Sequence, residues 1–145
     1  MSDPTTPAPT RFEPRPSELT LPFWNATREH ELLVQWCHDC DAGIHYPRVI
    51  CPRCLGSDLG WRTSSGDATV HAVSVQYSAG NPLMANRVPY AVALVDLPEG
   101  IRMMTNIVTD TPESVRVGDH VRIAWEPLSD GRNLPVFAPA DPDDR

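Results

Sequence analysis

The fold of this chain is decided by residues 37–54, which read CHDCDAGIHYPRVICPRC. The stretch holds two Cys-x-x-Cys pairs, Cys37/Cys40 and Cys51/Cys54, separated by ten residues. Each pair can wrap one edge of a tetrahedral ion, and two facing turns supply the four thiolates of a structural zinc site. We therefore predict a structural Zn²⁺ bound by all four cysteines, with residues 41–50 forming a hairpin between the two pairs.

Other interpretations of the four cysteines are open at this point. Two disulfides would need an oxidising compartment, and a thioredoxin-like redox pair would need a βαβ context. Iron is accepted by the same four-sulfur geometry, so Fe is the alternative to zinc. A saturated site leaves neither a free thiol for nucleophilic attack nor an open metal position for water. We therefore expect no catalytic residue in this chain, although a self-contained small hydrolase or redox protein is a rival hypothesis.

The composition indicates one small β-rich domain with an appendage. Proline contributes 16 of the 145 residues, roughly twice the usual share of about 5%, which argues against a helix bundle. The formal net charge is −7, which makes the chain a poor electrostatic match for nucleic acid. No apolar run approaches the ~20 residues that span a bilayer, and the first residues do not read as a secretory signal. We expect a cytoplasmic location and no membrane.

The chain divides into four segments by its composition and sequence pattern. Residues 1–18 are rich in proline and poor in apolar side chains, which predicts a flexible arm that is extended or disordered by itself. It is either a flexible tail or an arm that orders against another subunit. Residues 19–62 are expected to form a short helix over 22–29, a strand over 31–36 and the cysteine-rich ribbon. Residues 63–139 are expected to form a barrel, and residues 140–145 an acidic tail.

Five short β-type runs follow Trp61 and are too few for an immunoglobulin-type sandwich, but they suffice for a small closed barrel. The runs are 68–77, 89–96, 101–108, 115–125 and 134–138, and a hairpin turn at 97–100 joins the second to the third. The run 68–77 is expected to place Val73, Val75 and Tyr77 on one face.

Three residues near the second cysteine pair are candidates for ligand binding. Tyr46 and Arg48 lie between the pairs and Arg53 lies inside the second, where a guanidinium could bind phosphate in a bidentate manner. The simpler interpretation is a packed aromatic with two solvated arginines. Because small barrels also bind single strands, a nucleic-acid-binding module is a second hypothesis for function, and it predicts binding that falls steeply with salt.

A wider set of motifs supports a family resemblance over residues 19–139. They are Pro22-Phe23-Trp24, the two cysteine pairs, Tyr46-Pro47-Arg48, Gly66, the run 89–95, Glu99-Gly100, Val117-Gly118-Asp119 and Pro135-Val136-Phe137. In this order they resemble the zinc-ribbon and OB-fold family of acyl-CoA-associated proteins, long catalogued as a domain of unknown function. One departure is Asp41-Ala42-Gly43, which stands where relatives often carry a glycine directly after the first pair.

The resemblance implies a mainly β fold with an N-terminal helical arm, a rubredoxin-like zinc ribbon and a C-terminal five-stranded OB-fold barrel. It also implies a non-catalytic accessory subunit. Members resemble partners of thiolase-fold enzymes, such as acyl-CoA thiolases and the aldolases that shorten steroid side chains, and some work beside hydratases. Such a subunit would stabilise the catalytic one and help to form its acyl-CoA site, to which we assign Tyr46, Arg48 and Arg53 as candidate contacts.

Overall fold

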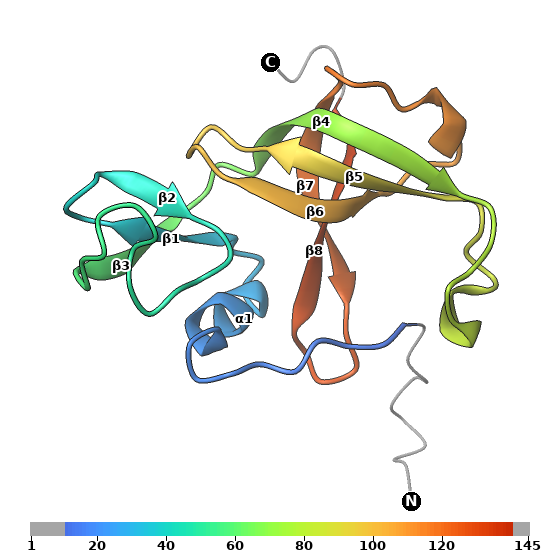
Figure 1. Ribbon diagram of the computed structural model, residues 1–145. Coiled ribbons are helices and arrows are strands. Elements are labelled where there is room, and N and C mark those ends of the chain that lie inside the picture. The colour runs from blue at the N-terminus through green and yellow to red at the C-terminus, as the bar shows by residue number, and fades with distance from the viewer. Residues whose placement is uncertain (1–10, 141–145) are drawn as a thin grey trace, which may run out of the picture.

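The computed structural model describes residues 11–140. A small three-stranded sheet in the order β2-β1-β3 is followed by a closed five-stranded barrel in the order β4-β5-β6-β8-β7 (Figure 1). The predicted mainly β class, with a ribbon and a five-stranded barrel, is therefore confirmed. No helix in the described part of the chain is long and apolar enough to cross a membrane.

The helix and the small sheet come first along the chain. Helix α1 spans Leu21–Thr27 and has Pro22 in its first turn, where the missing N–H has no intrahelical acceptor to lose. Strand β1 spans Leu33–Cys37 and pairs antiparallel with both β2 (Ala42–Ile44) and β3 (Leu59–Thr63).

The barrel is built from five longer strands and two short 3-10 turns. The strands are β4 (Asp67–Gln76), β5 (Tyr90–Asp96), β6 (Arg102–Ile107), β7 (His120–Pro127) and β8 (Asn133–Pro139), and the turns are η1 (Pro82–Met84) and η2 (Pro112–Ser114). The predicted turn between β5 and β6 is present, with the Gly100 N–H donating to the Leu97 carbonyl at 3.0 Å.

One hydrophobic core joins the ribbon to the barrel. Val34 of β1 is buried in the same cluster as Val95 of β5 and Phe137 of β8. Gly43 of β2 permits this close packing, because a Cβ there would lie 2.8 Å from Ile101 Cγ2. The ribbon is therefore packed against the β5–β6 turn, which lies at the ribbon side of the barrel in Figure 1.

The alternation of faces expected over residues 68–77 is interrupted by a bulge that precedes Val73. The pairing of β4 with β5 shifts register between Val70 and Ala72, so one extra residue enters the strand. Ala68 and Val70 point into the core before this bulge, and Val73 packs against the core after it. A bulge switches the alternation of faces, which simple period-two reasoning misses. Tyr77 lies beyond the end of β4 and is exposed.

The described part of the N-terminal arm is held against the barrel of its own chain. Glu13 accepts hydrogen bonds from the Ser129 backbone N–H at 2.7 Å and from its hydroxyl at 2.6 Å. The Pro14 carbonyl accepts one from the Arg132 guanidinium at 2.9 Å. Residues 13 and 14 of the arm thus contact the barrel of their own chain, whereas ordering against another subunit stays a prediction, and the first ten residues lie outside the described part of the chain.

Gly66 is a position where the fold demands glycine. Its φ is +85°, and a Cβ there would lie 2.3 Å from Ile123 Cγ2. We expect Gly66→Ala to lower the free energy of unfolding by about 2–4 kcal/mol, from the left-handed backbone and from overpacking together. Gly100→Ala is the matched control, because Gly100 has a φ of +84° with no atom near its Cβ position. Urea titration should show that Gly66→Ala lowers the free energy of unfolding more than Gly100→Ala does. Equal decreases in the two variants would refute the packing argument.

Candidate metal centre and the groove beside the ribbon

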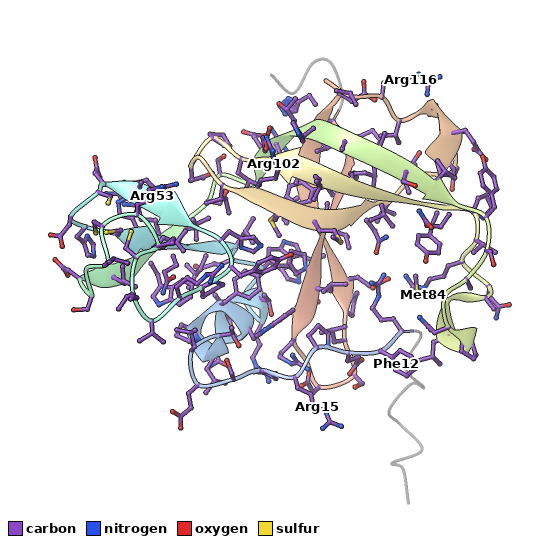
Figure 2. The ribbon with its side chains drawn as sticks, viewed as in Figure 1. Phe12, Arg15, Arg53, Met84, Arg102 and Arg116 are labelled. Carbon is purple, nitrogen blue, oxygen red and sulfur yellow. The ribbon has the colours of Figure 1, made fainter. Side chains whose placement is uncertain are left out.

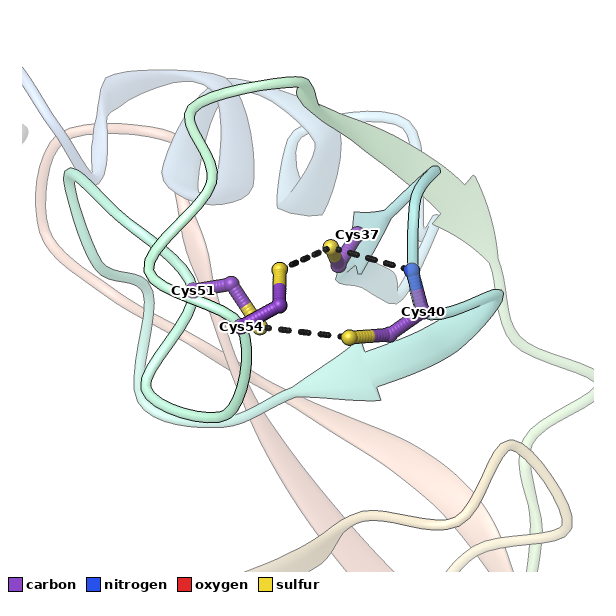
Figure 3. A group of neighbouring side chains, drawn as sticks. All are labelled: Cys37, Cys40, Cys51 and Cys54. Atoms are coloured by element: carbon purple, nitrogen blue, oxygen red, sulfur yellow. Dashed lines mark hydrogen bonds between the residues drawn. The ribbon is translucent and has the colours of Figure 1, made fainter.

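The four cysteine sulfurs converge at the tip of the ribbon (Figure 3). All four Sγ atoms lie within 4.8 Å of one another; Cys37 and Cys54 are 3.7 Å apart, and Cys40 and Cys51 are 3.8 Å apart. A regular tetrahedron with metal–sulfur bonds of about 2.3 Å has sulfurs ~3.8 Å apart, so the spacing fits a four-coordinate ion. The four predicted ligands are therefore brought together in the arrangement that a metal ion requires.

The backbone of the two cysteine turns is shaped for thiolates. Backbone N–H groups of Cys40, Arg53 and Gly56 each donate to a cysteine sulfur at 3.4 Å. The backbone N–H groups of Cys54 and Arg53 also lower the pKa of the Cys51 thiol to about 6, whereas the hydrogen bond with Cys54 and burial raise the pKa of Cys40 to about 12. The two turns therefore favour the thiolate most at Cys51.

The two turns share one backbone feature. The residue after each second cysteine has a left-handed backbone, with a φ of +52° at Asp41 and +60° at Leu55. Glycine adopts this conformation most easily. At Asp41 the side chain provides compensation, because its Oδ1 accepts hydrogen bonds from Trp36 Nε1 at 3.2 Å and from Arg62 at 3.3 Å. The departure from the expected glycine therefore leaves the ligand geometry intact.

The segment between the cysteine pairs differs from the predicted hairpin. Residues 42–44 form strand β2, which pairs with β1 and not with residues 45–50. The buried side chain of Gln35 holds those later residues in place: its Nε2 donates to the Arg48 carbonyl at 2.8 Å, and its Oε1 accepts from the Arg48 N–H at 2.6 Å. A buried amide on β1 thus provides the pairing that a second hairpin strand would have supplied.

An apolar groove lies where the ribbon meets the barrel. It has a volume of about 210 Å³ and is lined mainly by apolar side chains, among them Phe23 and Trp24 of α1 and Met103 of β6. Tyr46, one of the three predicted ligand contacts, also lines it. The neighbouring His45 lies in the same wall, and its burial lowers the imidazole pKa to about 4, so the ring is neutral at pH 7.

Comparison with known proteins identifies the architecture. Residues 24–60 match the family model described as "ChsH2, rubredoxin-like zinc ribbon domain", and residues 61–126 match "ChsH2, C-terminal OB-fold domain". The chain belongs to the ChsH2 family. The resemblance inferred from the cysteine pairs and the barrel motifs is confirmed.

Relatives of this ChsH2-family chain carry two kinds of description. A "Probable enoyl-CoA hydratase alpha subunit" of Thermomonospora curvata is 34% identical over 140 residues, which are 95% of this chain and 43% of that protein. A "3-oxo-4,17-pregnadiene-20-carboxyl-CoA hydratase alpha subunit" of Mycobacterium tuberculosis is 30% identical over 80% of this chain and 40% of its own length. The chain thus spans less than half of these two proteins. A "DUF35 domain-containing scaffold protein" of Methanothermobacter thermautotrophicus is 30% identical over 73% of this chain and 80% of that protein.

Solved structures of the same architecture extend the comparison. A chain of the "Ltp2-ChsH2(DUF35) aldolase" is 31% identical, with a TM-score of 0.79 over 89% of this chain and 100% of that one. A DUF35-family protein of unknown function from Sulfolobus solfataricus is 18% identical, with a TM-score of 0.62 over 85% of this chain and 86% of that one. The second likeness shows the fold alone.

Of the three predicted ligand contacts, Tyr46 lines the groove of this ChsH2-family fold. Arg48 and Arg53 are exposed, and neither lines the groove that contains Tyr46. Figure 2 shows Arg53 on the ribbon, well away from the side of the barrel where Phe12 and Met84 lie. The backbone N–H of Arg53 donates to the Cys51 sulfur, and the role of its side chain as a ligand contact stays a prediction.

Other residues that border the groove could not be found from the sequence. Pro14 of the arm and Leu134 of β8 reach it from opposite ends of the chain. No local pattern marks them, because the groove exists only after the arm has packed on the barrel.

Proposed function

We propose that this chain is a non-catalytic accessory subunit that binds and stabilises a thiolase-fold acyl-CoA enzyme, either a thiolase or a retro-aldolase. It also helps to form the acyl-CoA site of that enzyme. The observation that carries the proposal is the match over the whole length of a chain in the Ltp2-ChsH2(DUF35) aldolase, at 31% identity. The scaffold and hydratase alpha subunit descriptions of the other relatives support an accessory role, with a hydratase as a further partner.

The metal centre supports a structural role for the ion, which we propose to be Zn²⁺ with Fe as the alternative. Four thiolates complete the coordination of zinc and leave no position for water or substrate. Bound zinc would hold the two cysteine turns together. The catalytic groups are then expected to belong to the partner, because a bound ion would occupy all four thiols in the chain.

Exposed apolar side chains on the ribbon are suited to covering by another protein. The ribbon patch consists of Tyr46, Val49, Ile50 and Leu55, and Val49 is 76% exposed. Contiguous exposed apolar patches on a protein surface mark interaction sites. We propose that the catalytic subunit covers this patch. Arg48 and Arg53 beside it would then lie close to the partner, where they could reach the phosphates of the bound coenzyme A.

Co-expression tests this proposal directly. The chain should be co-expressed and co-purified with each candidate acyl-CoA thiolase or aldolase of the same organism. The double variant Val49→Asp/Ile50→Asp should lower the recovery of the complex at least tenfold, because two carboxylates would have to be desolvated in the interface. Val117→Asp is the matched control, since Val117 is as exposed but lies before β7 on the barrel. Equal recovery with both variants would exclude the ribbon patch, and no complex with the native chain would refute the proposed function.

A further inference from the structure

Strand β6 has one fully paired edge and one edge that is largely open. On one side it pairs with β5 at every position from Arg102 to Ile107, whereas on the other it pairs with β8 only at Ile107, opposite Phe137. Two positions before Phe137 in β8 stands Pro135, which has no N–H with which to continue that ladder. The open part of the edge therefore runs from Arg102 to Asn106.

The hydrogen bonds at the two ends of β6 show which backbone groups face the open edge. Ile101, just before the strand, faces β5, because its carbonyl accepts from the Leu97 N–H at 2.9 Å. Val108, just after the strand, faces β8, because its N–H donates to the Phe137 carbonyl at 2.7 Å. The backbone groups of successive residues in a strand point alternately to its two sides. The N–H and C=O of Met104 therefore point away from β5, toward the open edge.

These two groups of Met104 are free to pair with another strand. Two backbone groups of β8 near this edge already have partners: the Asn133 N–H donates to Thr27 Oγ1 at 3.1 Å, and the Pro135 carbonyl accepts from Thr105 Oγ1 at 3.3 Å. In the part of the chain that the structure describes, the backbone of Met104 has no such partner on its open side. An exposed row of unpaired N–H and C=O groups is a template for pairing with another chain.

There is space beside this edge for an added strand. Residues 103–106 of β6 each line one or both of two cavities, the groove beside the ribbon and a second cavity of about 420 Å³. Helix α1 and strand β8 supply apolar side chains to the groove, among them Trp24 and Leu134. Met104 is 61% exposed, so the edge is reached from solvent.

The surroundings of the edge decide what can pair with it. The residues that border it come from the segment after β2, with Tyr46 and Pro47, and from β8, with Leu134 and Pro135. Figure 1 shows the β7–β8 hairpin extending beyond the rest of the barrel on this side. Two copies of this chain would have to bring two such bordered edges within about 4.8 Å of each other, and their walls would collide. A single extended segment needs no such approach.

We propose that the open edge of β6 binds one extended segment of the catalytic subunit, which adds a strand to the barrel beside residues 102–106. Main-chain groups of that segment pair with the N–H and C=O of Met104, and its alternate side chains enter the groove beside the ribbon. Phe23, Trp24 and Met103 line that groove, so the segment presents uncharged, apolar side chains there, since a charged one would have to be desolvated.

The choice of partner rests on the proposed function. Tyr46 belongs both to the ribbon patch and to the walls of the groove, so the subunit that covers the patch also reaches the edge of β6. The open edge itself is a property of this chain and does not depend on that choice.

Amide hydrogen exchange of the native, metal-loaded full chain tests the proposal without a variant. In the chain alone, the Met104 amide should exchange about 100-fold faster than the Thr105 amide, whose N–H points to β5. In the purified complex with the acyl-CoA thiolase or aldolase, exchange at Met104 should slow by about 100-fold. The amide of Val117, an exposed residue of the loop before β7, is the control and should exchange equally in both states.

Two variants at one position separate the backbone from the side chain. Met104→Pro removes the outward N–H and no hydrogen bond of the β5–β6 ladder, and proline is tolerated at an edge whose N–H faces solvent. It should lower the recovery of the complex about tenfold, roughly the cost of one main-chain hydrogen bond left unmade. Met104→Val keeps the N–H and an apolar side chain, and it should give the native recovery.

Each contrary outcome has a definite meaning. The proposal is overturned if Met104 in the free chain exchanges as slowly as Thr105, because the edge is then closed. If the complex forms but Met104 stays unprotected, or if a folded Met104→Pro chain is recovered like the native one, the added strand is refuted and the proposed function stands. Should Met104→Pro fail to fold, the exchange of the native chain decides.

Two further outcomes concern the occupant of the edge. Protection of Met104 that rises with the concentration of the chain alone would make a second copy the occupant and overturn the assignment to the catalytic subunit. If the native chain forms no complex with any candidate enzyme, the proposed function and this assignment fall together.

Discussion

A Cys51→Ser chain is expected to lose its metal and the native structure of the ribbon tip. Cys51 is fully buried, and the cluster around it consists of Cys37 and Ile44 with Cys40 and Leu59 packed against it. Apart from two aliphatic side chains, this local core is made of the ligands themselves. In such small sites, the free energy of metal binding, about 10–16 kcal/mol for structural zinc in isolated fingers, is largely folding free energy. Loss of one thiolate should therefore unfold the tip.

Metal analysis and an amide NMR spectrum of the Cys51→Ser chain would measure this effect. We expect a zinc content near zero, with the resonances of residues 37–60 collapsed to unfolded positions. His38→Ala is the control, because His38 lies inside the first Cys-x-x-Cys turn but is exposed. It should keep one metal ion and a native spectrum. A Cys51→Ser chain that stays folded, metal-free and able to bind its partner would contradict the structural role of the ion.

Phe137→Ala is expected to cost the barrel about 3–5 kcal/mol of unfolding free energy. Phe137 is the largest fully buried side chain in the described part of the chain, with no exposed surface. It also lies at the one position where β6 pairs with β8, and its carbonyl accepts from the Val108 N–H at 2.7 Å. The cavity left by the smaller side chain would remove apolar contacts on both sides of the position where β6 pairs with β8. The loss approaches the whole stability of a small domain, about 5–15 kcal/mol.

Urea unfolding of the metal-loaded chain, followed by tryptophan fluorescence, would measure the Phe137→Ala effect. Phe12→Ala is the matched control, since Phe12 is 70% exposed, and its removal should change stability by no more than about 0.5 kcal/mol. If Phe137→Ala lowers the free energy of unfolding by less than about 1 kcal/mol, the barrel is not held together where β6 pairs with β8.

The metal centre was predictable because its determinants are local. Two Cys-x-x-Cys turns separated by ten residues specify four ligands without knowledge of the rest of the fold. The barrel strands were likewise predictable within one to five residues at their ends, since each is a short apolar run between turns. The bulge in β4 was not, because an extra residue in a strand depends on how the neighbouring strand pairs and leaves no mark in the alternation itself.

The grouping of three charged side chains on the barrel could not be foreseen for a different reason. Arg11, Arg87 and Glu126 come from the arm, from the loop before β5 and from β7, and only the closed barrel brings them together. In the sequence they read as three unrelated surface charges. Arg48 and Arg53, by contrast, were selected because they stand next to the cysteines, although neither lines the groove beside the ribbon.

The most direct measurement is a count of metal ions and reactive thiols in the purified, folded full chain. Plasma mass spectrometry should find one zinc ion per chain, and a thiol reagent should find no reactive cysteine until a strong chelator releases all four. A folded chain with no metal and with thiols that react at once would show that the sulfurs are available for chemistry. The assignment of this chain as a metal-stabilised, non-catalytic subunit would then be wrong.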